Sequence, residues 1–491
     1  MNVLAARCGS DDAARRQAGE RLLQRLRDDG IERVRIGWCD LHGALRGKTL
    51  MAGAVADALR DGIGMVGTLM LKDSSDRTAF KVFEPGLADS LSGFGMAGNL
   101  LLLPDPASFQ LLPWCAGTGW LRAQPWFADG APVPLDSRRV LQRAVQRLQG
   151  HGWGLKCGLE VEFHIYRIES ENLDPAQAAW PGEPPAVAMI HPGYHLLAEA
   201  WADRADEPLR IVQHTAQGLG LPLRSLEIEL GPSQVEAVFD ATDALAAADR
   251  MVLFRSAVAQ ALRRAGYLAT FMCRPPFANV MSSGWHLHQS LVDLQSGRNL
   301  FMREQPLSAS TPHDAQHTLS RLGEQYLGGL LAHARALAAF ATPTVNGYGR
   351  FAAAHALAPQ AARWGRDNRG AMLRVLGAAG DAGTRIENRL GEPAANPYAY
   401  IASQIHAGLD GIEQDLLPGR ATDAPYAQGG TRLPTTLREA LAALADDAAL
   451  CEAMESVFVD SFCRIKHQEV QRFESAADKD EWQRREYFSR I

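Results

Sequence analysis

The sequence lacks the cysteine patterns of disulfide-rich and zinc-binding proteins. Its seven cysteines are dispersed along 491 residues, and none stands in a CxxC pair. A dispersed, odd count fits a reducing cytoplasm better than a disulfide framework or a zinc site. The N-terminus carries Asp11 and Asp12 and has no apolar segment behind a basic start. We therefore expect no signal peptide and a cytoplasmic location.

Long apolar runs and an excess of positive charge are also missing. The longest apolar stretches, such as residues 330–342, are interrupted by His and Arg, so we expect no transmembrane helix and no membrane partner. A net charge of −6 argues against general affinity for nucleic acids. The sequence also contains no GxxxxGK[ST] motif and no GxGxxG after a predicted strand. Any nucleotide site would therefore be neither a P-loop nor a Rossmann site.

The content of 46% hydrophobic and 22% charged residues is ordinary for a globular protein with a large core. Periodicity predicts an α+β chain in which strands precede and interleave with helices. The expected helices cover residues 13–30, 137–150, 243–265 and about 314–341, with more helices from about 397. The expected strands cover residues 31–38, 158–166, 226–230, 267–272, 285–288 and 384–389. A Pro-rich aromatic segment at 123–135 predicts a boundary between domains 1–125 and 126–491.

The strand at residues 158–166 carries an unusual set of ionisable side chains. Alternate side chains point to opposite faces, so Glu160, Glu162 and His164 share one face. Two carboxylates ~4 Å apart repel each other by about 4 kcal/mol at an effective dielectric constant of about 20. A shared proton, an Arg partner or a divalent cation relieves that repulsion. Two solvated acids on an exposed face are an equally good interpretation of this strand alone.

The same alternation recurs in three further segments. Glu227 and Glu229, His286 and His288, and Arg385, Glu387 and Arg389 are each spaced two residues apart with apolar residues between them. This pattern predicts a curved sheet with one face on helices and the other lining a polar cavity. Carboxylates with one imidazole and no Cys cluster suit Mg²⁺ or Mn²⁺.

Arginines are concentrated in residues 350–374. Arg350 follows an Asn-Gly-Tyr-Gly turn, and Arg366, Arg369 and Arg374 lie close together beyond it. A solvated basic surface is the usual explanation of such a run. Neighbouring acidic strands and flanking Gly and Trp residues favour a phosphate clamp instead. A divalent metal with Arg is typical equipment for phosphoryl transfer.

In these segments the chain resembles the glutamine synthetase family. The matching segments are 40–43, 104–106, 112–114, 158–163, 229–236, 283–291, 346–350, 364–374, 385–389 and 393–398. They span nearly the whole chain in the family's order. The resemblance implies an N-terminal β-grasp domain and a catalytic domain with a curved antiparallel sheet backed by helices. It also implies a homo-oligomer, a dodecamer of two hexameric rings with sites between subunits.

The resemblance further implies the roles of individual residues. Metal ligands would be Glu162, Glu229 and Glu236 for one ion and Glu160, His286 and Glu387 for the other. Glutamate would be bound by Arg350, Arg389 and Gly284, ATP by His288, Ser290, Arg374 and Arg385, and the catalytic residues would be Arg369 and Asp40. The implied cofactors are ATP and two or more Mg²⁺ or Mn²⁺ ions. In the family's reaction glutamate attacks ATP to form γ-glutamyl phosphate, and an amine then displaces phosphate.

Two departures from the family concern the substrates. The flap after Arg350 contains no acid, and the family's Glu position falls on Ala356 or Leu357. Met281 and Ser282 replace the usual Asn and Gly, which puts the hold on glutamate in doubt. A pocket without the flap carboxylate should bind ammonium poorly, because ammonium-type cations have a pKa near ~10.4.

An arylamine is neutral at pH 7 and suits an acid-free pocket. Trp285, where the family usually has Met, would supply an apolar wall, although core packing explains it as well. We therefore expect an ATP-dependent γ-glutamylamide ligase of amine catabolism, with an aniline-like amine favoured. The alternatives are an ordinary glutamine synthetase using ammonium, a γ-glutamylpolyamine or monoamine synthetase, and an inactive structural paralogue.

Overall fold

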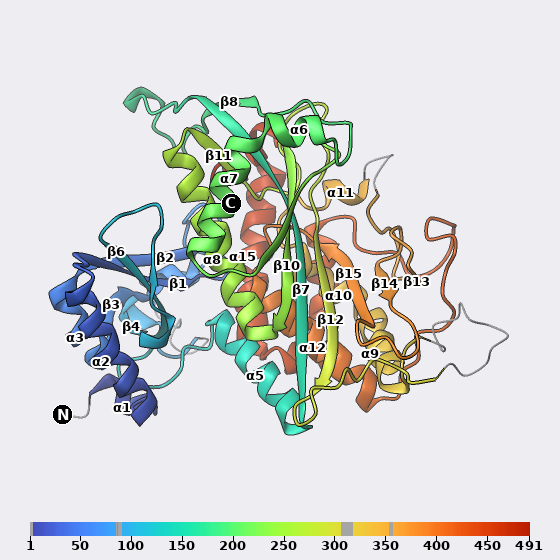
Figure 1. Ribbon diagram of the computed structural model, residues 1–491, viewed down its shortest axis with the longest axis horizontal. Coiled ribbons are helices and arrows are strands. Elements are labelled where there is room, and N and C mark those ends of the chain that lie inside the picture. The colour runs from blue at the N-terminus through green and yellow to red at the C-terminus, as the bar shows by residue number, and fades with distance from the viewer. Residues whose placement is uncertain (1–2, 85, 87–90, 306–317, 353–356) are drawn as a thin grey trace.

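The structure is a computed structural model that describes residues 3–84, 86, 91–305, 318–352 and 357–491. Two β-sheets organise this part of the chain, and most of the helices pack around the second sheet. In Figure 1 the first sheet lies in the blue N-terminal part, at one side of the molecule. The second sheet lies at the centre, where the long strand β7 runs through it. The predicted α+β class is confirmed.

The first sheet has the strand order β2-β1-β6-β4-β3, with β5 added to β6. Its strands are β1 (Arg33–Cys39), β2 (Leu45–Met51), β3 (Ile63–Val66), β4 (Asn99–Pro104), β5 (Gln110–Leu111) and β6 (Thr118–Trp126). The pairing of β1 with β6 is parallel, and the other pairs are antiparallel. The helices α1 (Leu4–Arg7), α2 (Ala13–Asp28) and α3 (Val55–Asp61) belong to this part. A mixed sheet with helices at its side is consistent with the β-grasp domain that the resemblance implied.

The second sheet has the order β13-β14-β15-β12-β7-β10-β9, and β8 and β11 also pair with β7. Its first strands are β7 (Trp153–Ser170), β8 (Ala186–Met189), β9 (Leu223–Ile228), β10 (Gln234–Asp243) and β11 (Tyr267–Thr270). The others are β12 (Trp285–Asp293), β13 (Trp364–Arg366), β14 (Leu373–Leu376) and β15 (Arg385–Gly391). Apart from the parallel pair β13 and β14, neighbouring strands are antiparallel. The central strand β7 therefore lies between β10 and β12, and β9 and β15, which were predicted to carry ionisable residues, lie one strand further out on either side.

The sequence-based strand at 226–230 is wrong at its end. Strand β9 stops at Ile228, and a turn then leads into β10. Ser233, the residue before β10, has a left-handed φ of 60°. The backbone N–H of Glu229 donates to the carbonyl of Gln234 across that turn. Strand β10 was not predicted at all, although its residues alternate, because the short turn hid the start of a new strand.

The helices begin where capping residues satisfy their first backbone N–H groups. Asp12, Asp136 and Asp243 accept hydrogen bonds from N–H groups of α2, α5 (Ser137–Gly150) and α8 (Ala244–Arg264). These three helices confirm the predictions over 13–30, 137–150 and 243–265. The predicted block at 314–341 is two helices, α9 (Arg321–Ala332) and α10 (Ala334–Ala341). Its first residues, 314–317, lie outside the described residues.

The remaining helices are α6 (Glu199–Arg204), α7 (Asp206–Gly218), α11 (Gly349–Ala352), α12 (Pro397–Glu413), α13 (Leu437–Ala445), α14 (Ala448–Ala453), α15 (Ser456–Ser475) and α16 (Lys479–Tyr487). Helices α5 and α8 pack on β7, and α12 packs on both of them. The apolar face of β7 supplies Val161, Phe163 and Ile165, which are completely buried. Among the helices that the structure describes, none has the length and hydropathy needed to cross a bilayer. The helices thus fix one face of the sheet and leave the other to the polar side chains.

Helices α9 and α12 approach each other through glycines. A Cβ at Gly329 would lie 2.0 Å from the carbonyl oxygen of Ala407 and 2.8 Å from the Cα of Gly411. Backbone atoms cannot move aside as a flexible side chain can. We therefore expect Gly329 to be required for this helix contact.

We predict that Gly329→Ala lowers the free energy of unfolding by about 1–3 kcal/mol, the usual cost of overpacking. The control is Gly150→Ala at the end of α5, where an added Cβ would meet nothing within 4 Å. Alanine is the better helix former, so the control should match or slightly exceed wild type. Urea unfolding followed by circular dichroism measures both variants. Equal midpoints for the two variants would contradict the prediction.

Candidate active site

The ionisable residues of the second sheet become neighbours through strand register. His286 on β12 pairs directly with Glu160 on β7, and Glu236 on β10 pairs with Glu162 on β7. Directly opposite residues in an antiparallel pair have Cβ atoms about 4.5–5.5 Å apart. Further along the sheet, Glu387 on β15 pairs with His288 on β12. The register thus gathers on one face the side chains that alternation alone had placed strand by strand.

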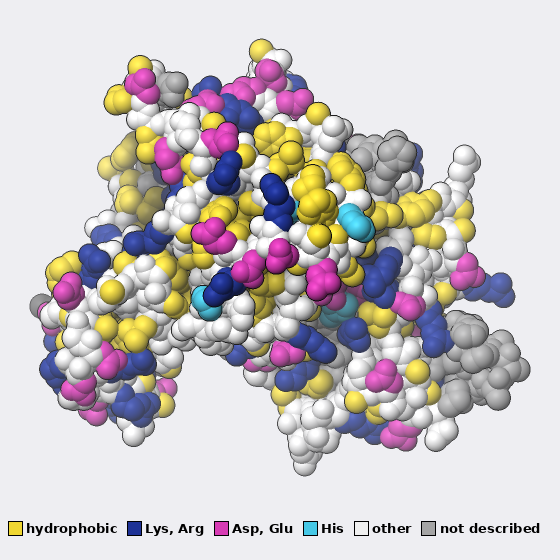
Figure 2. Space-filling model, turned by 45° about the horizontal axis from the view of Figure 1, so that its top comes forward, with side chains coloured by type: hydrophobic (Ala, Val, Ile, Leu, Met, Phe, Trp, Pro, Cys, Tyr) yellow, Lys and Arg dark blue, Asp and Glu magenta, His cyan; other side chains and the backbone are white. Residues whose placement is uncertain are grey.

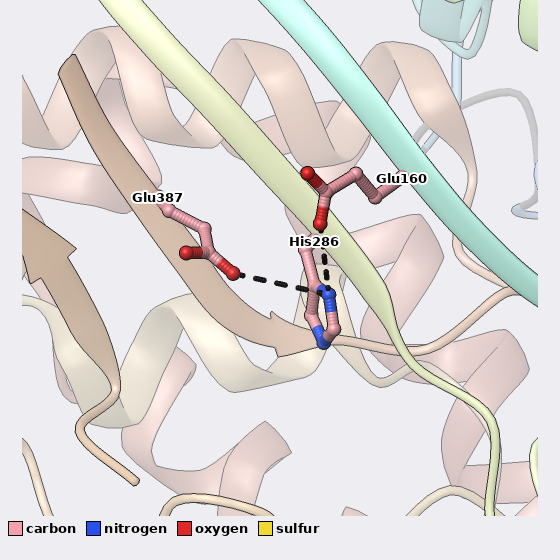
Figure 3. A group of neighbouring side chains, drawn as sticks. All are labelled: Glu160, His286 and Glu387. Atoms are coloured by element: carbon pink, nitrogen blue, oxygen red, sulfur yellow. Dashed lines mark ion pairs between the residues drawn. The ribbon is translucent and has the colours of Figure 1, made fainter. Parts of the chain in front are cut away.

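The first group of possible metal ligands consists of Glu160, His286 and Glu387 (Figure 3). The Nδ1 atom of His286 lies 3.5 Å from Oε2 of Glu160 and 3.8 Å from Oε1 of Glu387. Figure 3 shows both carboxylates directed toward this imidazole from separate strands. The predicted set for one ion is therefore brought together in the fold.

A second group consists of Glu162, Glu236 and the same His286. His286 Nε2 lies 3.7 Å from Oε1 of Glu162, and His286 Nδ1 lies 4.0 Å from Oε1 of Glu236. Glu229, the third predicted ligand of this set, follows the end of β9 and does not join the compact group. It is still close enough for its charge to raise the pKa of both Glu162 and Glu236.

The pKa values separate the two groups. Burial raises the pKa of Glu236 to about 9, and the charges of Glu162 and Glu160 add to this effect. Burial and the charge of Glu229 raise the pKa of Glu162 to about 7. Burial also acts on Glu160, but the imidazoles of His286 and His288 outweigh it and hold the pKa of this carboxyl below its usual range. The carboxyls of the second group therefore retain protons to higher pH than Glu160 does, because they are buried and repel one another when ionised.

These donors fit a divalent cation that prefers oxygen ligands. Burial lowers the pKa of His286 to about 4, so its imidazole is neutral and has a lone pair available for a ligand. Its Nε2 atom is buried and has no hydrogen-bond partner among the described residues. A cation between the carboxylates would relieve both their repulsion and this unpaired nitrogen. Mg²⁺ or Mn²⁺ matches the donor set better than a structural zinc ion does.

Arginines surround Glu387. Arg374 Nη1 donates to Glu387 Oε2 over 3.0 Å, and Arg389 Nη1 forms an ion pair with the other oxygen. Despite burial, His286 and Arg389 lower the pKa of Glu387. On β15, Arg385 Nε donates to His288 Nδ1 over 3.0 Å. The predicted ATP-binding residues His288, Arg374 and Arg385 thus lie around the first metal group.

Arg350 is buried beside Gly284. Its Nη1 donates to the carbonyl of Gly391 over 2.9 Å. A Cβ at Gly284 would lie 2.7 Å from Arg350 Nη2, so a larger residue here would displace the Arg350 guanidinium. The backbone N–H of Gly284 also donates to Glu162 Oε2 over 2.8 Å. Gly284 therefore joins the predicted glutamate site to the second metal group.

Other predicted residues are less tightly placed. Arg369 is exposed and close enough to act on the pKa of Glu229, and Leu357 is 65% exposed. Ser290 is on β12, opposite Lys156. Of the two flap positions considered, Ala356 lies outside the described residues.

Trp285 is completely buried, and its ring packs edge-on against Tyr400 with 5.1 Å between ring centroids. Packing in the core is therefore what the structure displays for this side chain. Contact with a substrate stays a prediction.

Asp40 is buried in the turn after β1, and its carboxylate is bound by that turn. Oδ1 accepts hydrogen bonds from the N–H groups of His42 and Ala44, and Oδ2 accepts one from Arg46 Nε. All of these partners belong to residues 42–46 of the same chain. The structure does not bring Asp40 into either metal group of its own chain.

Three residues next to the site received no role from sequence reasoning: Gln234, Ser283 and His164. Gln234 Nε2 donates to Glu162 Oε2 over 3.0 Å and to Ser283 Oγ over 3.1 Å. Ser283 Oγ lies 3.3 Å from His164 Nδ1. The alternation of Gln234 with Glu236 was the signal that could have placed Gln234 on the same face.

Acidic, basic and histidine side chains lie together across the middle of one face of the molecule (Figure 2). Hydrophobic side chains border them on the same face. Such a surface suits charged phosphate and carboxylate groups beside a less polar group. It fits a ligand site better than a nucleic-acid surface, which would carry mainly basic side chains.

Known proteins share this architecture. The model of the glutamine synthetase catalytic domain matches residues 134–487. Gamma-glutamylanilide synthase from an Acinetobacter species is 39% identical over 497 residues, which cover 96% of both chains. Gamma-glutamylethanolamide synthetase from Streptomyces coelicolor is 31% identical and covers 94% of this chain and 93% of its own.

A solved structure agrees with these relatives. The GmaS complex with ADP is 31% identical, has a TM-score of 0.75 and covers 94% of this chain and 98% of its own. The similarity thus includes both sheets and not only the segment that carries the carboxylates. This chain belongs to the glutamine synthetase family and is an ATP-dependent carbon–nitrogen ligase of that type.

Proposed function

We propose that the protein joins the γ-carboxylate of L-glutamate to an organic amine, with an aniline-like arylamine as the preferred substrate. The observation that carries this proposal is the buried face of β7, β10, β12 and β15, where carboxylates, one imidazole and arginines converge. Carboxylate oxygen is a poor leaving group, so the amide cannot form directly. ATP converts it into an acyl phosphate, from which an amine can displace phosphate.

The metal roles follow the two groups of carboxylates. Glu160, His286 and Glu387 would hold one ion, and Glu162, Glu236 and Glu229 the other, as Mg²⁺ or Mn²⁺. Bound divalent ions supply charge stabilisation for phosphoryl transfer. The raised pKa values of Glu162 and Glu236 support this assignment, because they show that the ionised carboxylates are unfavourable together unless a cation joins them.

The arginines would bind the substrates. Arg350 and Arg389, with the backbone at Gly284, would hold the carboxylate of glutamate. Arg374 and Arg385, with His288 and Ser290, would contact ATP near the first metal group. Arg369 is exposed near Glu229 and would stabilise the transferring phosphoryl group, as guanidinium groups do in other phosphoryl-transfer sites.

Four features support an arylamine. The relative that is 39% identical over nearly the whole chain is named for an anilide product. The phenol of Tyr426 is partly exposed, and Arg389 and Arg350 act on its pKa, so an aromatic side chain lies near the proposed glutamate site. Leu357, which is exposed, adds an apolar group where the family has an acid. Trp285 would supply an apolar wall beneath the proposed amine pocket.

We also propose that Asp40 serves a neighbouring subunit. Its carboxylate is held by its own turn and takes no part in the metal groups of its own chain. A dodecamer of two hexameric rings would place this turn against the cavity of the next subunit. In that arrangement residues 1–125 and 126–491 act as separate domains that meet across the interface.

We predict that ADP release with glutamate and Mg²⁺ depends strongly on the amine. Aniline-type amines should give the highest kcat/KM, because they are neutral at pH 7 and need no acid to hold an ammonium cation. The panel contains ammonium, methylamine, ethanolamine, a polyamine and substituted anilines. Glu387→Gln serves as the inactive control. Turnover of ammonium as efficient as that of the best amine would overturn the arylamine assignment.

We predict a characteristic pH dependence for the metal-free protein. The folded state raises the pKa of Glu236 from 4.5 to about 9, so it binds more protons than the unfolded state between these values. The contribution of protonated Glu236 to the free energy of unfolding is therefore present at low pH and is lost as pH rises toward 9. In EDTA, the unfolding midpoint should fall more steeply from pH 6 to 9 for wild type than for Glu236→Gln.

Mn²⁺ must displace the same protons. We expect wild type to bind Mn²⁺ more tightly as pH rises over this range, and Glu236→Gln to lose most of that dependence. Calorimetric titration at several pH values measures the affinity. Parallel pH profiles for the two proteins, both with and without metal, would contradict the role given to Glu236.

We predict that two inactive chains restore activity when they assemble together. Asp40→Asn and Glu387→Gln should each be inactive alone. In mixed oligomers, some cavities with an intact Glu387 meet a neighbour with an intact Asp40, so part of the activity returns. The measurement is ADP release after co-expression, with separately purified chains mixed just before the assay as the control. No recovery would place Asp40 outside the neighbour's site.

A further inference from the structure

The side chain of Gln234 holds one oxygen of Glu162 in place. Gln234 Nε2 donates to Glu162 Oε2, and the backbone N–H of Gly284 donates to the same oxygen. The other oxygen, Oε1, lies 3.7 Å from His286 Nε2. Two donors on Oε2 therefore turn Oε1 toward the second metal group.

The orientation of the Gln234 amide is itself determined by its neighbours. Its Oε1 accepts a hydrogen bond from the backbone N–H of Gly231 over 2.9 Å. A flipped amide would place two donors against each other at Gly231. The Nε2 hydrogens are thus directed toward Glu162 and toward Ser283 Oγ, 3.1 Å away.

The assignment of donors and acceptors extends this series of hydrogen bonds to His164. Because Ser283 Oγ accepts from Gln234, its single hydroxyl hydrogen is free to be donated elsewhere. In this direction the Ser283 hydroxyl lies within hydrogen-bonding distance of His164 Nδ1, at 3.3 Å. A neutral imidazole protonated at Nε2 provides that lone pair. Hydrogen bonds then run in one direction, from Ser283 to His164 and from Gln234 to both Ser283 and Glu162.

Packing alone does not explain a histidine at position 164. The side chain is completely buried beside Tyr166, and its Nε2 atom has no hydrogen-bond partner among the described residues. Burying an unpaired polar atom is destabilising, and an apolar side chain would avoid that cost. The imidazole is therefore better explained by the hydrogen bond at its other nitrogen.

We propose that His164 is a positioning residue that acts through Ser283 and Gln234 to orient Glu162 toward the metal. The inference rests on the proposed function, since it requires Glu162 to be a metal ligand. Groups that orient metal ligands through hydrogen bonds usually affect metal affinity strongly when they are removed. The strand position explains the arrangement, because His164 on β7 lies directly opposite Gln234 on β10.

The test compares two variants of the same size. His164→Asn keeps an acceptor near the position of Nδ1, whereas His164→Leu removes it. Both variants lose the ring and leave a similar space, so the loss of packing is common to them. Mn²⁺ affinity is measured by calorimetry on the metal-stripped full chain, and thermal unfolding is recorded for each variant.

We expect His164→Leu to weaken Mn²⁺ binding by about 10-fold or more. His164→Asn should stay close to wild type, and Ser283→Ala should resemble His164→Leu. Combining Ser283→Ala with His164→Leu should add little, because both break the same chain of hydrogen bonds. Equal affinities for the Asn and Leu variants would overturn the proposal.

Glu162→Gln separates this proposal from the proposed function. If Glu162→Gln abolishes one class of Mn²⁺ sites while His164→Leu binds like wild type, only the positioning role of His164 fails. If Glu162→Gln binds Mn²⁺ like wild type, the metal assignment itself fails.

Discussion

The repulsion among buried carboxylates on neighbouring strands is the constraint on which this site depends. Glu160, Glu162 and Glu236 lie on one face because β7 and β10 alternate and pair in register. Helices cover the opposite face, so the strands cannot turn these groups to solvent without exposing their apolar side chains. The hydrophobic core thus holds together a cluster of charges that would otherwise separate. A bound cation would relieve the repulsion in such a cluster.

The protein compensates this charge unevenly. On the side of β15, Arg374, Arg389 and the imidazoles balance Glu387 and Glu160. On the side of β10, protein cations do not balance Glu162 and Glu236, and their pKa values rise. The two halves therefore differ in how strongly protons compete with a metal.

The departures from the family's pattern lie in the elements around the site. The proposed metal ligands follow that pattern, whereas the flap lacks an acid and the loop before β12 contains Met281 and Ser282. Substrate preference would thus depend on loops, and the geometry of the proposed ligands on the hydrogen bonds from Gln234, Ser283 and His164.

The sequence by itself determined the local features: helix starts at Asp136 and Asp243, alternation along 158–166, and the order of the family's motifs. These follow from interactions within a few residues, so pattern and propensity are sufficient to predict them. The tertiary structure decided which residues meet. Gln234 donates a hydrogen bond to Glu162, which is 72 residues away in the sequence. Strand β10 pairs with β7 although the turn before it concealed its start in the sequence. Asp40 accepts a hydrogen bond from Arg46 of its own turn. Strand register and side-chain burial arise only when distant segments pack, so no local pattern could have specified them.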